Sequence, residues 1–313
     1  MINVYEAIYT ENLSRDFKNV RAVNELDLNI QAGQIFGFLG PNGAGKTTTI
    51  HLLLGLLEPS TGSARVLGND TRQASAKIRE QTGVLLEHTG LYERLSAEDN
   101  LNFYGRVWGL PAAARQARAR ELLDQLGLWE RRKEVVGKWS KGMKQKLAVA
   151  RAIFHRPALI FLDEPTSGLD PVSASQLHQD LQTLVKQEGT TIFLTTHNLT
   201  EAEQLCQQIA VIRQGRLLAK GTPAELRANQ SKPLVEVEGA NFSPHLIVSL
   251  RECAEVAGVN LKNEVLSIEL RRSNVSIAPL VKLIVDNGGQ IEEIRKSRKS
   301  LEDVFLELVR QGQ

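Results

Sequence analysis

The feature that most constrains this chain is a glycine-rich run between an apolar segment and a helix-forming segment. Residues 35–39 read Ile-Phe-Gly-Phe-Leu, as in a buried strand. Directly after them come Gly40, Pro41, Asn42, Gly43, Ala44, Gly45, Lys46, Thr47 and Thr48. Such a turn lets backbone N–H groups approach phosphates, and the following helix N-terminus adds partial positive charge. We therefore expect a phosphate-binding loop in which Lys46 reaches the β- and γ-phosphates of a nucleotide and Thr47 binds Mg²⁺.

A second apolar segment ends in two carboxylates. Residues 158–162 read Ala-Leu-Ile-Phe-Leu and lead into Asp163 and Glu164. Ligand sites of parallel sheets lie at the carboxyl ends of the strands, so both acids are expected beside the phosphates. There Asp163 would orient the Mg²⁺ shell, and Glu164 would polarise the attacking water. A solvated strand end is the alternative, and the preceding phosphate-binding loop favours the catalytic reading.

The order of the elements predicts an α/β core with a helical insertion. Strand-like runs at 35–39, 159–162 and 191–195 alternate with helical stretches, which indicates a parallel sheet wrapped by helices. Between about 92 and 152 the pattern is mainly helical, with 112–126 rich in helix-forming residues. We therefore expect a nucleotide-binding domain at 1–229 that contains this helical subdomain.

The remainder of the chain has a different order. Residues 230–233 are polar and end in proline, which suggests a domain boundary. Beyond them, 234–238 and 265–270 alternate like half-buried strands, whereas 279–285 and 301–309 repeat apolar positions at helical spacing. Residues 230–313 are therefore predicted to form a small accessory α+β domain, for which a ferredoxin-like arrangement is one option.

Composition excludes several classes of protein. The 38 Lys and Arg residues nearly balance the 36 Asp and Glu residues, and the formal charge of +2 argues against a dedicated nucleic-acid binder. Cys206 and Cys253 lack the spacing of a zinc site or a disulfide framework. The apolar runs fall far short of the roughly 20 residues that span a bilayer, and Glu6 and Glu11 interrupt any secretion signal. A cytoplasmic protein is expected.

A short motif carries a family resemblance. Residues 139–143 read Trp-Ser-Lys-Gly-Met and resemble the Leu-Ser-Gly-Gly-Gln signature of ABC ATPases, with Lys141 in place of the first glycine. The resemblance implies that Ser140 and Gly142 contact the γ-phosphate of an ATP bound by a second ATPase subunit, so that hydrolysis requires a dimer, with a homodimer favoured. The alternative for Ser140 is a plain helix N-cap.

Four more positions follow from the same resemblance. Asp170 ends a Ser-Gly-Leu-Asp segment that resembles the D-loop of the family, and His197 ends a Thr-Thr-His segment that resembles its switch loop. Phe17 occupies the position where the family stacks an aromatic ring on adenine, although a core residue is an open alternative. Glu87 stands where the family offers a glutamine to Mg²⁺, and a carboxylate is also a suitable ligand.

The resemblance covers roughly residues 4–229, and the ending at 300–306 looks like that of daunorubicin-resistance-type exporters. It implies an ATP- and Mg²⁺-dependent ATPase subunit that lies on the inner face of the cell membrane and powers export through a separate multi-spanning permease, with no nucleic-acid partner. The alternative is a soluble ABC ATPase acting on nucleic acid or ribosomes. Such relatives typically carry a long coiled-coil insertion or tandem ATPase halves, whereas this chain has one phosphate-binding loop and no extended heptad run.

Overall fold

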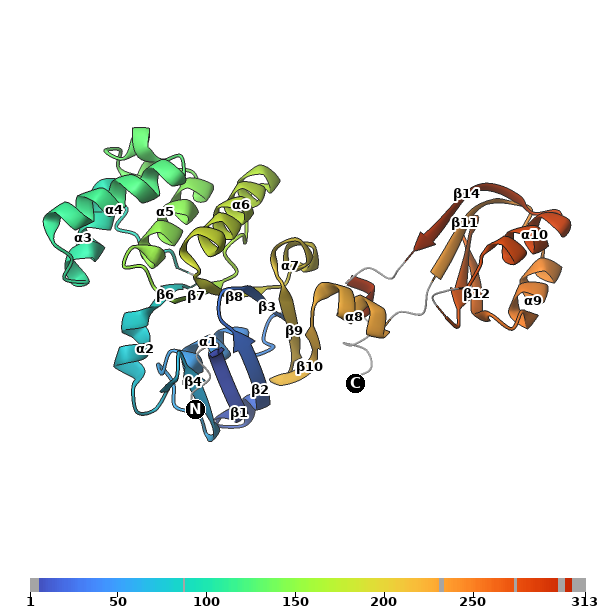
Figure 1. Cartoon of the computed structure of the whole chain (residues 1–313), viewed down its shortest axis with the longest axis horizontal. Helices are drawn as coiled ribbons and strands as arrows, with labels where there is room; N and C mark the ends of the chain where they lie inside the picture. Colours follow the sequence, from blue (N-terminus) through green and yellow to red (C-terminus); the bar gives the residue numbers. More distant parts are fainter. Residues whose placement is uncertain (1–5, 87, 231–233, 273–274, 298–301, 306–313) are drawn as a thin grey trace. The chain divides into compact units, whose positions relative to one another are not determined.

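The computed structural model describes residues 6–86, 88–230, 234–272, 275–297 and 302–305. The chain divides into two compact units, Met1–Thr222 and Pro223–Gln313 (Figure 1). The division falls at the start of helix α8 (Pro223–Gln230), whereas the sequence suggests a boundary near the end of that helix. The boundary at 229–230 therefore stays a prediction, and each unit is described by itself.

A six-stranded sheet forms the centre of the first unit. Five strands are parallel, and β10 alone runs antiparallel to its neighbour β9. In spatial order they are β10 (Arg216–Gly221), β9 (Gln208–Arg213), β3 (Ile35–Leu39), β8 (Thr191–Thr196), β7 (Leu159–Asp163) and β6 (Thr82–Leu85). Every residue of β3, β7 and β8 is buried, which explains why β3 is apolar throughout and why β7 and β8 carry polar side chains only at their ends. The predicted parallel α/β core is confirmed.

A second, antiparallel sheet packs with helix α1 (Lys46–Leu53) in the same unit. Its strands in spatial order are β2 (Val20–Gln31), β1 (Glu6–Phe17), β4 (Thr61–Val66) and β5 (Asn69–Asp70). One apolar cluster joins Leu13 of β1, Leu26 of β2 and Ile50 of α1 to the central sheet. The phosphate-binding loop is therefore held between two sheets that share a core.

Four aromatic rings connect the three strands that lead to the predicted site. The ring of Phe193 in β8 lies 5.7 Å from Phe36 and 5.3 Å from Phe38, both in β3, and 5.5 Å from Phe161 in β7, measured between ring centroids. All four side chains are fully buried. Because side chains alternate along a strand, Phe161 shares a face with Asp163, and Phe193 shares a face with Thr195.

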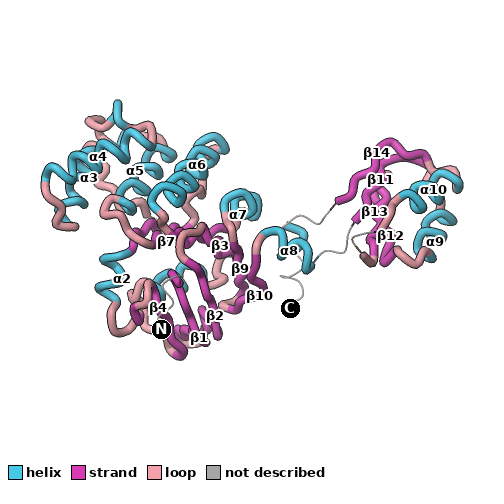
Figure 2. The backbone as a smooth tube through the Cα atoms, viewed as in Figure 1, coloured by secondary structure: helices cyan, strands magenta, loops and turns pink. Residues whose placement is uncertain are grey.

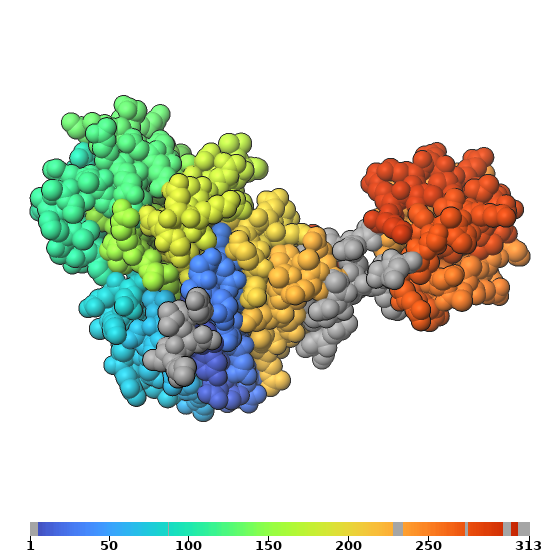
Figure 3. Space-filling view, in the orientation of Figure 1, coloured from blue at the N-terminus to red at the C-terminus, as the bar shows by residue number. Residues whose placement is uncertain are grey.

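Helices form a separate lobe of the first unit, shown in green in Figure 3 and found in Figure 2 by the labels α3, α4 and α5. This lobe contains α3 (Ala97–Val107), α4 (Ala112–Gln125), the short 3₁₀ turns at Trp129–Arg131 and Val136–Lys138, and α5 (Lys141–Ile153). The expected helical insertion is thus confirmed. The other helices of the unit are α2 (Ser75–Gln81), α6 (Pro171–Glu188) and α7 (Leu199–Leu205). Within the described ranges, no helix combines the length and apolar character needed to cross a membrane.

Beyond α8, the second unit contains an antiparallel sheet against which helices α9 and α10 pack. Along the chain come β11 (Leu234–Ala240), α9 (Pro244–Glu252), β12 (Val256–Lys262), β13 (Val265–Leu270), α10 (Ala278–Asp286) and β14 (Gln290–Ser297), and the strand order is β12-β13-β11-β14. Apolar residues of both helices and the sheet form one core. This β-α-β-β-α-β order is that of the ferredoxin-like motif. Of the helix predicted at 301–309, residues 302–305 are helical and the rest lies outside the described residues.

Candidate active site

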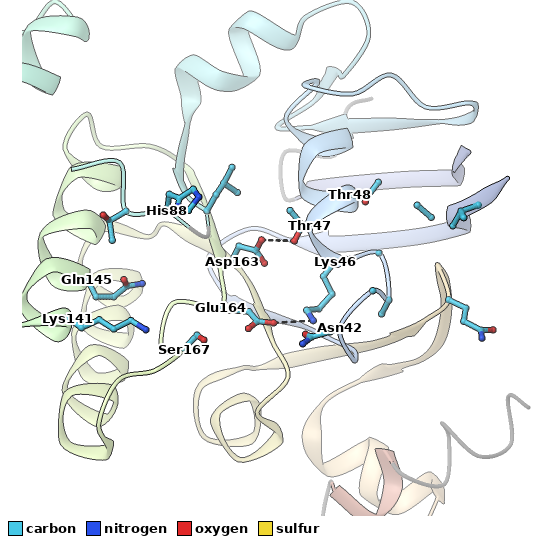
Figure 4. A pocket seen from close by; sticks show the side chains of 18 of the residues that line it. Asn42, Lys46, Thr47, Thr48, His88, Lys141, Gln145, Asp163, Glu164 and Ser167 are labelled. Atoms are coloured by element: carbon cyan, nitrogen blue, oxygen red, sulfur yellow. Dashed lines mark hydrogen bonds and ion pairs between the residues drawn. The ribbon is translucent and has the colours of Figure 1, made fainter. Parts of the chain in front are cut away.

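The carboxyl ends of β3, β7 and β8 meet at one edge of the parallel sheet. The register pairs Asp163 with Thr195 and Leu39 with Thr196, so the loops that follow these strands begin side by side. A pocket of about 1020 Å³ opens at this edge (Figure 4). The predicted site residues that line it are Asn42, Gly43, Ala44, Gly45, Lys46, Thr47, Thr48, Asp163 and Glu164.

The phosphate-binding loop encloses the Lys46 ammonium. Gly45 has a φ of +104°, and a Cβ added there would collide with the carbonyl oxygen of Ala22, so this position requires glycine. The Nζ of Lys46 donates to the carbonyl oxygens of Gly40 at 2.8 Å and Pro41 at 3.3 Å. With a side chain only 6% exposed, Lys46 directs its charge at the pocket rather than at bulk water.

Asp163 joins the loop to the neighbouring strand. The Thr47 hydroxyl donates to Oδ2 of Asp163 at 2.8 Å, and the Thr195 hydroxyl donates to Oδ1. Carboxylate and hydroxyl oxygens are the ligands that Mg²⁺ prefers, and Mg²⁺ completes its shell with phosphate oxygens and water. Over the part of the chain that the structure describes, no cluster of three His, Cys, Asp or Glu side chains could bind a metal alone. A shared site of this kind fits Thr47 and Asp163, whereas Glu87 lies outside the described residues.

Glu164 takes an unusual backbone conformation that aims its side chain into the pocket. Its φ of +49° is in the left-handed region, which costs free energy for a residue other than glycine. The backbone N–H of Glu164 donates to both the carbonyl and the hydroxyl oxygen of Thr195, each at 3.1 Å. The carboxylate lies between Lys46, whose Nζ is 3.2 Å from Oε1, and His197, whose Nδ1 is 3.0 Å from Oε2. His197 thus contacts the predicted general base without lining the pocket itself.

The residues expected to serve a second subunit lie elsewhere. Ser140 caps α5 by accepting from the N–H of Met143 at 3.3 Å, and Asp170 caps α6 by accepting from the N–H and hydroxyl of Ser173. The hydrogen bonds from Ser173 hold the pKa of Asp170 below its usual range. A Cβ on Gly142 would lie 2.8 Å from the Ser173 hydroxyl, so the two helix starts are neighbours. Ser140, Gly142 and Asp170 do not line the pocket.

Several lining residues were not identified from the sequence. Lys141 and Gln145 of α5 face the phosphate-binding loop across the pocket (Figure 4). Lys144 of the same helix also lines the pocket and forms an ion pair of 2.7 Å with Glu93. These three residues of α5 lie within or directly after the signature-like motif at 139–143. The family resemblance gives a role only to Ser140 and Gly142 of that motif, so it did not point to them. The other lining residues are Val20, Arg21, Ala22, Leu86, His88, Thr89, Glu93, Ser167 and Gln214.

Phe17 is at the end of β1 and does not line the pocket, although Val20 does. Its side chain is 40% exposed, so it is not a core residue, and the guanidinium of Arg15 lies 4.7 Å from its ring centroid. A cation above one ring face is a favourable contact in its own right. Stacking of Phe17 on adenine stays a prediction.

Comparison with known proteins agrees with this arrangement. Residues 23–167 match the family described as ABC transporter, and residues 221–309 match the family described as ATP-binding protein DrrA1-3-like, C-terminal domain. The bacitracin transport ATP-binding protein BcrA of Bacillus licheniformis is 33% identical over 97% of this chain and 98% of its own length. The daunorubicin/doxorubicin resistance ATP-binding protein DrrA of Streptomyces peucetius is 44% identical over 71% of this chain and 67% of its own length.

Solved structures agree with the fold of the first unit. The structure of cbiO1 from Clostridium perfringens, described as part of the ABC transporter complex cbiONQ, superposes with a TM-score of 0.67. It is 27% identical and covers 72% of this chain and 91% of its own. Full-length similarity to curated relatives, the phosphate-binding loop and the two acids at the end of β7 lead to one assignment: the chain belongs to the ATP-binding proteins of the ABC transporter family.

Proposed function

We propose that this chain is the ATP-hydrolysing subunit of an exporter and that it powers a separate, membrane-spanning permease. The observation that carries the proposal is the meeting of Lys46, Asp163 and Glu164 at one edge of the parallel sheet. An ammonium, a metal-binding carboxylate and a candidate general base are the groups that phosphoryl transfer to water needs.

Each of these groups has a separate task. Lys46 and the backbone N–H groups at the start of α1 would bind the phosphates of ATP. Thr47 and Asp163 would hold Mg²⁺, which supplies neutralisation of the phosphate charge. Glu164 would accept a proton from water while the water oxygen attacks the γ-phosphorus and the bond to the β–γ bridging oxygen breaks. His197, 3.0 Å from Glu164, would orient that carboxylate and contact the γ-phosphate.

A second copy of the chain would complete each site. Ser140 and Asp170 are exposed at two neighbouring helix starts, and the Lys141 ammonium lies against Gly168 in the segment before Asp170. Because Ser140, Gly168 and Asp170 do not line the pocket of their own chain, they are available to a phosphate presented by another chain. A two-fold dimer would place them over the γ-phosphates of both sites.

Mixing two inactive variants tests the composite site. Lys46→Ala removes the phosphate contact, and Ser140→Arg blocks the helix start, so homodimers of either variant contain no intact site. A mixed dimer combines the intact loop of one chain with the intact Ser140 of the other. Equal mixing should therefore restore about a quarter of the wild-type ATPase rate, because half of the dimers hold one intact site of two. Activity that stays at the level of the separate variants would contradict shared sites.

The partner surface is proposed at an exposed aromatic group. Tyr92 is 46% exposed and Phe103 is 40% exposed, and their ring centroids are 4.8 Å apart, with Tyr104 beside both. Exposed aromatic side chains are enriched at protein interfaces. We place the permease contact here, on the inner face of the cell membrane, and we propose an antibiotic-like cargo from the names of the relatives BcrA and DrrA.

Membrane association tests this surface. Tyr92→Asp and Phe103→Asp should reduce cross-linking of the full chain to a multi-spanning membrane protein, while the basal ATPase rate stays unchanged. Leu56→Asp is the control, because Leu56 is 52% exposed but lies outside the aromatic group. Capture of ribosomes or DNA in place of a membrane protein would favour the alternative function of a soluble ABC ATPase.

A further inference from the structure

Glu201 is a buried carboxylate that lies outside the pocket lining. It is in the first turn of α7, and only 2% of its surface is exposed. Its Oε1 accepts from the Thr166 hydroxyl at 2.7 Å and lies 3.0 Å from Nε2 of His178, while its Oε2 accepts from the Thr196 hydroxyl at 2.5 Å. An ionised carboxylate only accepts hydrogen bonds, so Nε2 of His178 carries a hydrogen here.

These three donors keep the carboxylate charged. Burial alone would raise the pKa of Glu201, but the hydrogen bonds from His178, Thr196 and Thr166 hold it below its usual range. An isolated buried charge is costly, whereas a buried charge with several donors forms a stable network. The network is therefore a fixed cross-link between the segments that supply the donors.

Those segments carry the proposed catalytic groups. Thr166 is in the loop after β7, two residues beyond Glu164, and Thr196 directly precedes His197 at the end of β8. The third donor, His178, is in α6, the helix that Asp170 caps. Thr196 is fixed further, because its hydroxyl accepts from the N–H of Asn198 at 2.9 Å.

We propose that Glu201 is a positioning residue for ATP hydrolysis. By binding Thr166 and Thr196 with one carboxylate, it sets the distance between the loop that carries Glu164 and the loop that carries His197. The inference rests on the proposed ATPase function and deepens it. Small shifts of a positioned general base reduce turnover while leaving substrate binding intact, because binding depends on other contacts. The predicted signature is therefore a lower kcat at an unchanged KM for ATP.

Isosteric substitutions can remove each donor separately. Thr166→Val and Thr196→Val keep the side-chain shape and delete the hydroxyl, whereas Thr166→Ser and Thr196→Ser keep the hydroxyl. In the full chain with Mg²⁺ and ATP, each valine variant should lose about tenfold in kcat, with KM within about twofold. The serine variants should stay near the wild-type kcat.

Two controls separate positioning from general destabilisation. Thr190→Val removes a hydroxyl that donates to the carbonyl of Pro157 at 3.4 Å, at the opposite end of β8 from the pocket. Glu188→Gln weakens the half-buried ion pair between Glu188 and Arg118, whose N···O distance is 2.8 Å. Both controls should keep the wild-type kcat at a temperature below their melting midpoints, even where they lower the melting temperature.

The outcomes are distinguishable. A tenfold loss of kcat in the valine variants, with rescue by serine, supports positioning by Glu201. If the valine variants keep the wild-type kcat, or if Thr190→Val and Glu188→Gln lose as much, Glu201 has no positioning role. The proposed ATPase function survives that failure as long as Glu164→Gln abolishes turnover. Wild-type turnover in both Glu164→Gln and Lys46→Ala would instead overturn the function, and the positioning role with it.

Discussion

The central parallel sheet of the first unit and the antiparallel sheet of the second unit distribute their polar side chains differently. In the first, β3, β7 and β8 point the same way, so Lys46, Asp163 and Glu164 gather at one edge. In the second, neighbouring strands alternate in direction, and charged residues such as Glu236 of β11 and Arg295 of the edge strand β14 stand opposite each other away from the strand ends. Strand direction therefore gathers polar side chains at one edge of the sheet in the first unit and distributes them along the sheet in the second.

The comparison predicts that the same chemical change has unequal effects in the two units. Glu164→Gln should lower kcat about a thousandfold, because the amide cannot accept a proton from water. ATP affinity should change by less than about twofold, since phosphate binding uses Lys46. Steady-state phosphate release and binding of a fluorescent ATP analogue measure the two effects. The matched change Glu236→Gln, on β11, should leave both at wild-type values, and equal losses in the two variants would refute the comparison.

Replacing one lysine in each unit tests the same comparison through ATP affinity. Lys46→Ala should weaken ATP binding about 100-fold, because the variant leaves the phosphate charge without its nearest cation. Lys262→Ala removes an exposed cation from β12 of the second unit and should bind ATP as the wild type does. Titration calorimetry would measure the ATP dissociation constants of both variants. An unchanged affinity in Lys46→Ala would show that the loop does not bind the phosphates.

A change at the proposed metal ligand Asp163 should have a smaller effect than the two preceding changes. Asp163→Asn should raise the Mg²⁺ concentration for half-maximal ATPase activity about tenfold, because a neutral amide is a weaker ligand and also a poorer acceptor for Thr47. Thr47→Ser keeps the hydroxyl and should stay near the wild-type value. A Mg²⁺ titration at saturating ATP provides the comparison, and an unchanged midpoint in Asp163→Asn would place the metal elsewhere.

The smallest predicted effect concerns stability against acid. His155 stacks on Trp108 with ring centroids 3.8 Å apart, and burial lowers its pKa from 6.5 to about 4. The unfolded chain therefore binds a proton that the folded chain excludes, so this histidine costs stability as the pH falls from 6.5 towards 4.

His155→Phe keeps a ring but removes the ionisation. Over that pH range the melting temperature of the wild type should fall by about 3 °C more than that of the variant. His245→Phe, at an exposed position on α9 of the second unit, is the control and should retain the wild-type pH dependence. Differential scanning calorimetry would reveal the difference, and parallel curves for His155→Phe and the wild type would show that His155 is freely protonated in the folded chain.

Sequence patterns predicted the central strands of the parallel sheet, because a strand that is buried on both faces has a recognisable apolar composition. Strand β3 is apolar throughout, whereas β7 and β8 are apolar in the middle and polar at their ends. The carboxyl ends of all three strands lead into the residues of the site. Strand β1 was missed because register shifts between Thr10 and Leu13, and again near Arg15, break its alternation. Strand β2 alternates regularly over its second half, and this signal could have identified it.

Within the site, the meeting of the phosphate-binding loop with Asp163 and Glu164 was predictable, whereas the other contacts that hold these two acids were not. Ser140 of the signature-like motif caps α5, which was the alternative that the sequence offered for this residue. The Thr195 contacts with Asp163 and Glu164 depend on β8 lying beside β7, which the sequence separation of these strands does not reveal. From the sequence, Glu201 looks like a solvated residue of a polar helix, because only the assembled fold shows that donors from the loop after β7, from β8 and from α6 surround it.

The buried ring of Phe193 determines how a mutation of this residue would affect the protein. The ring touches aromatic neighbours on both adjacent strands, two residues before Thr195 and beneath the edge that carries Asp163. A smaller side chain there would let the strand ends drift relative to each other. Such a substitution would lower turnover as well as stability although it changes no residue of the pocket lining, so inspection of the lining residues alone would overlook it.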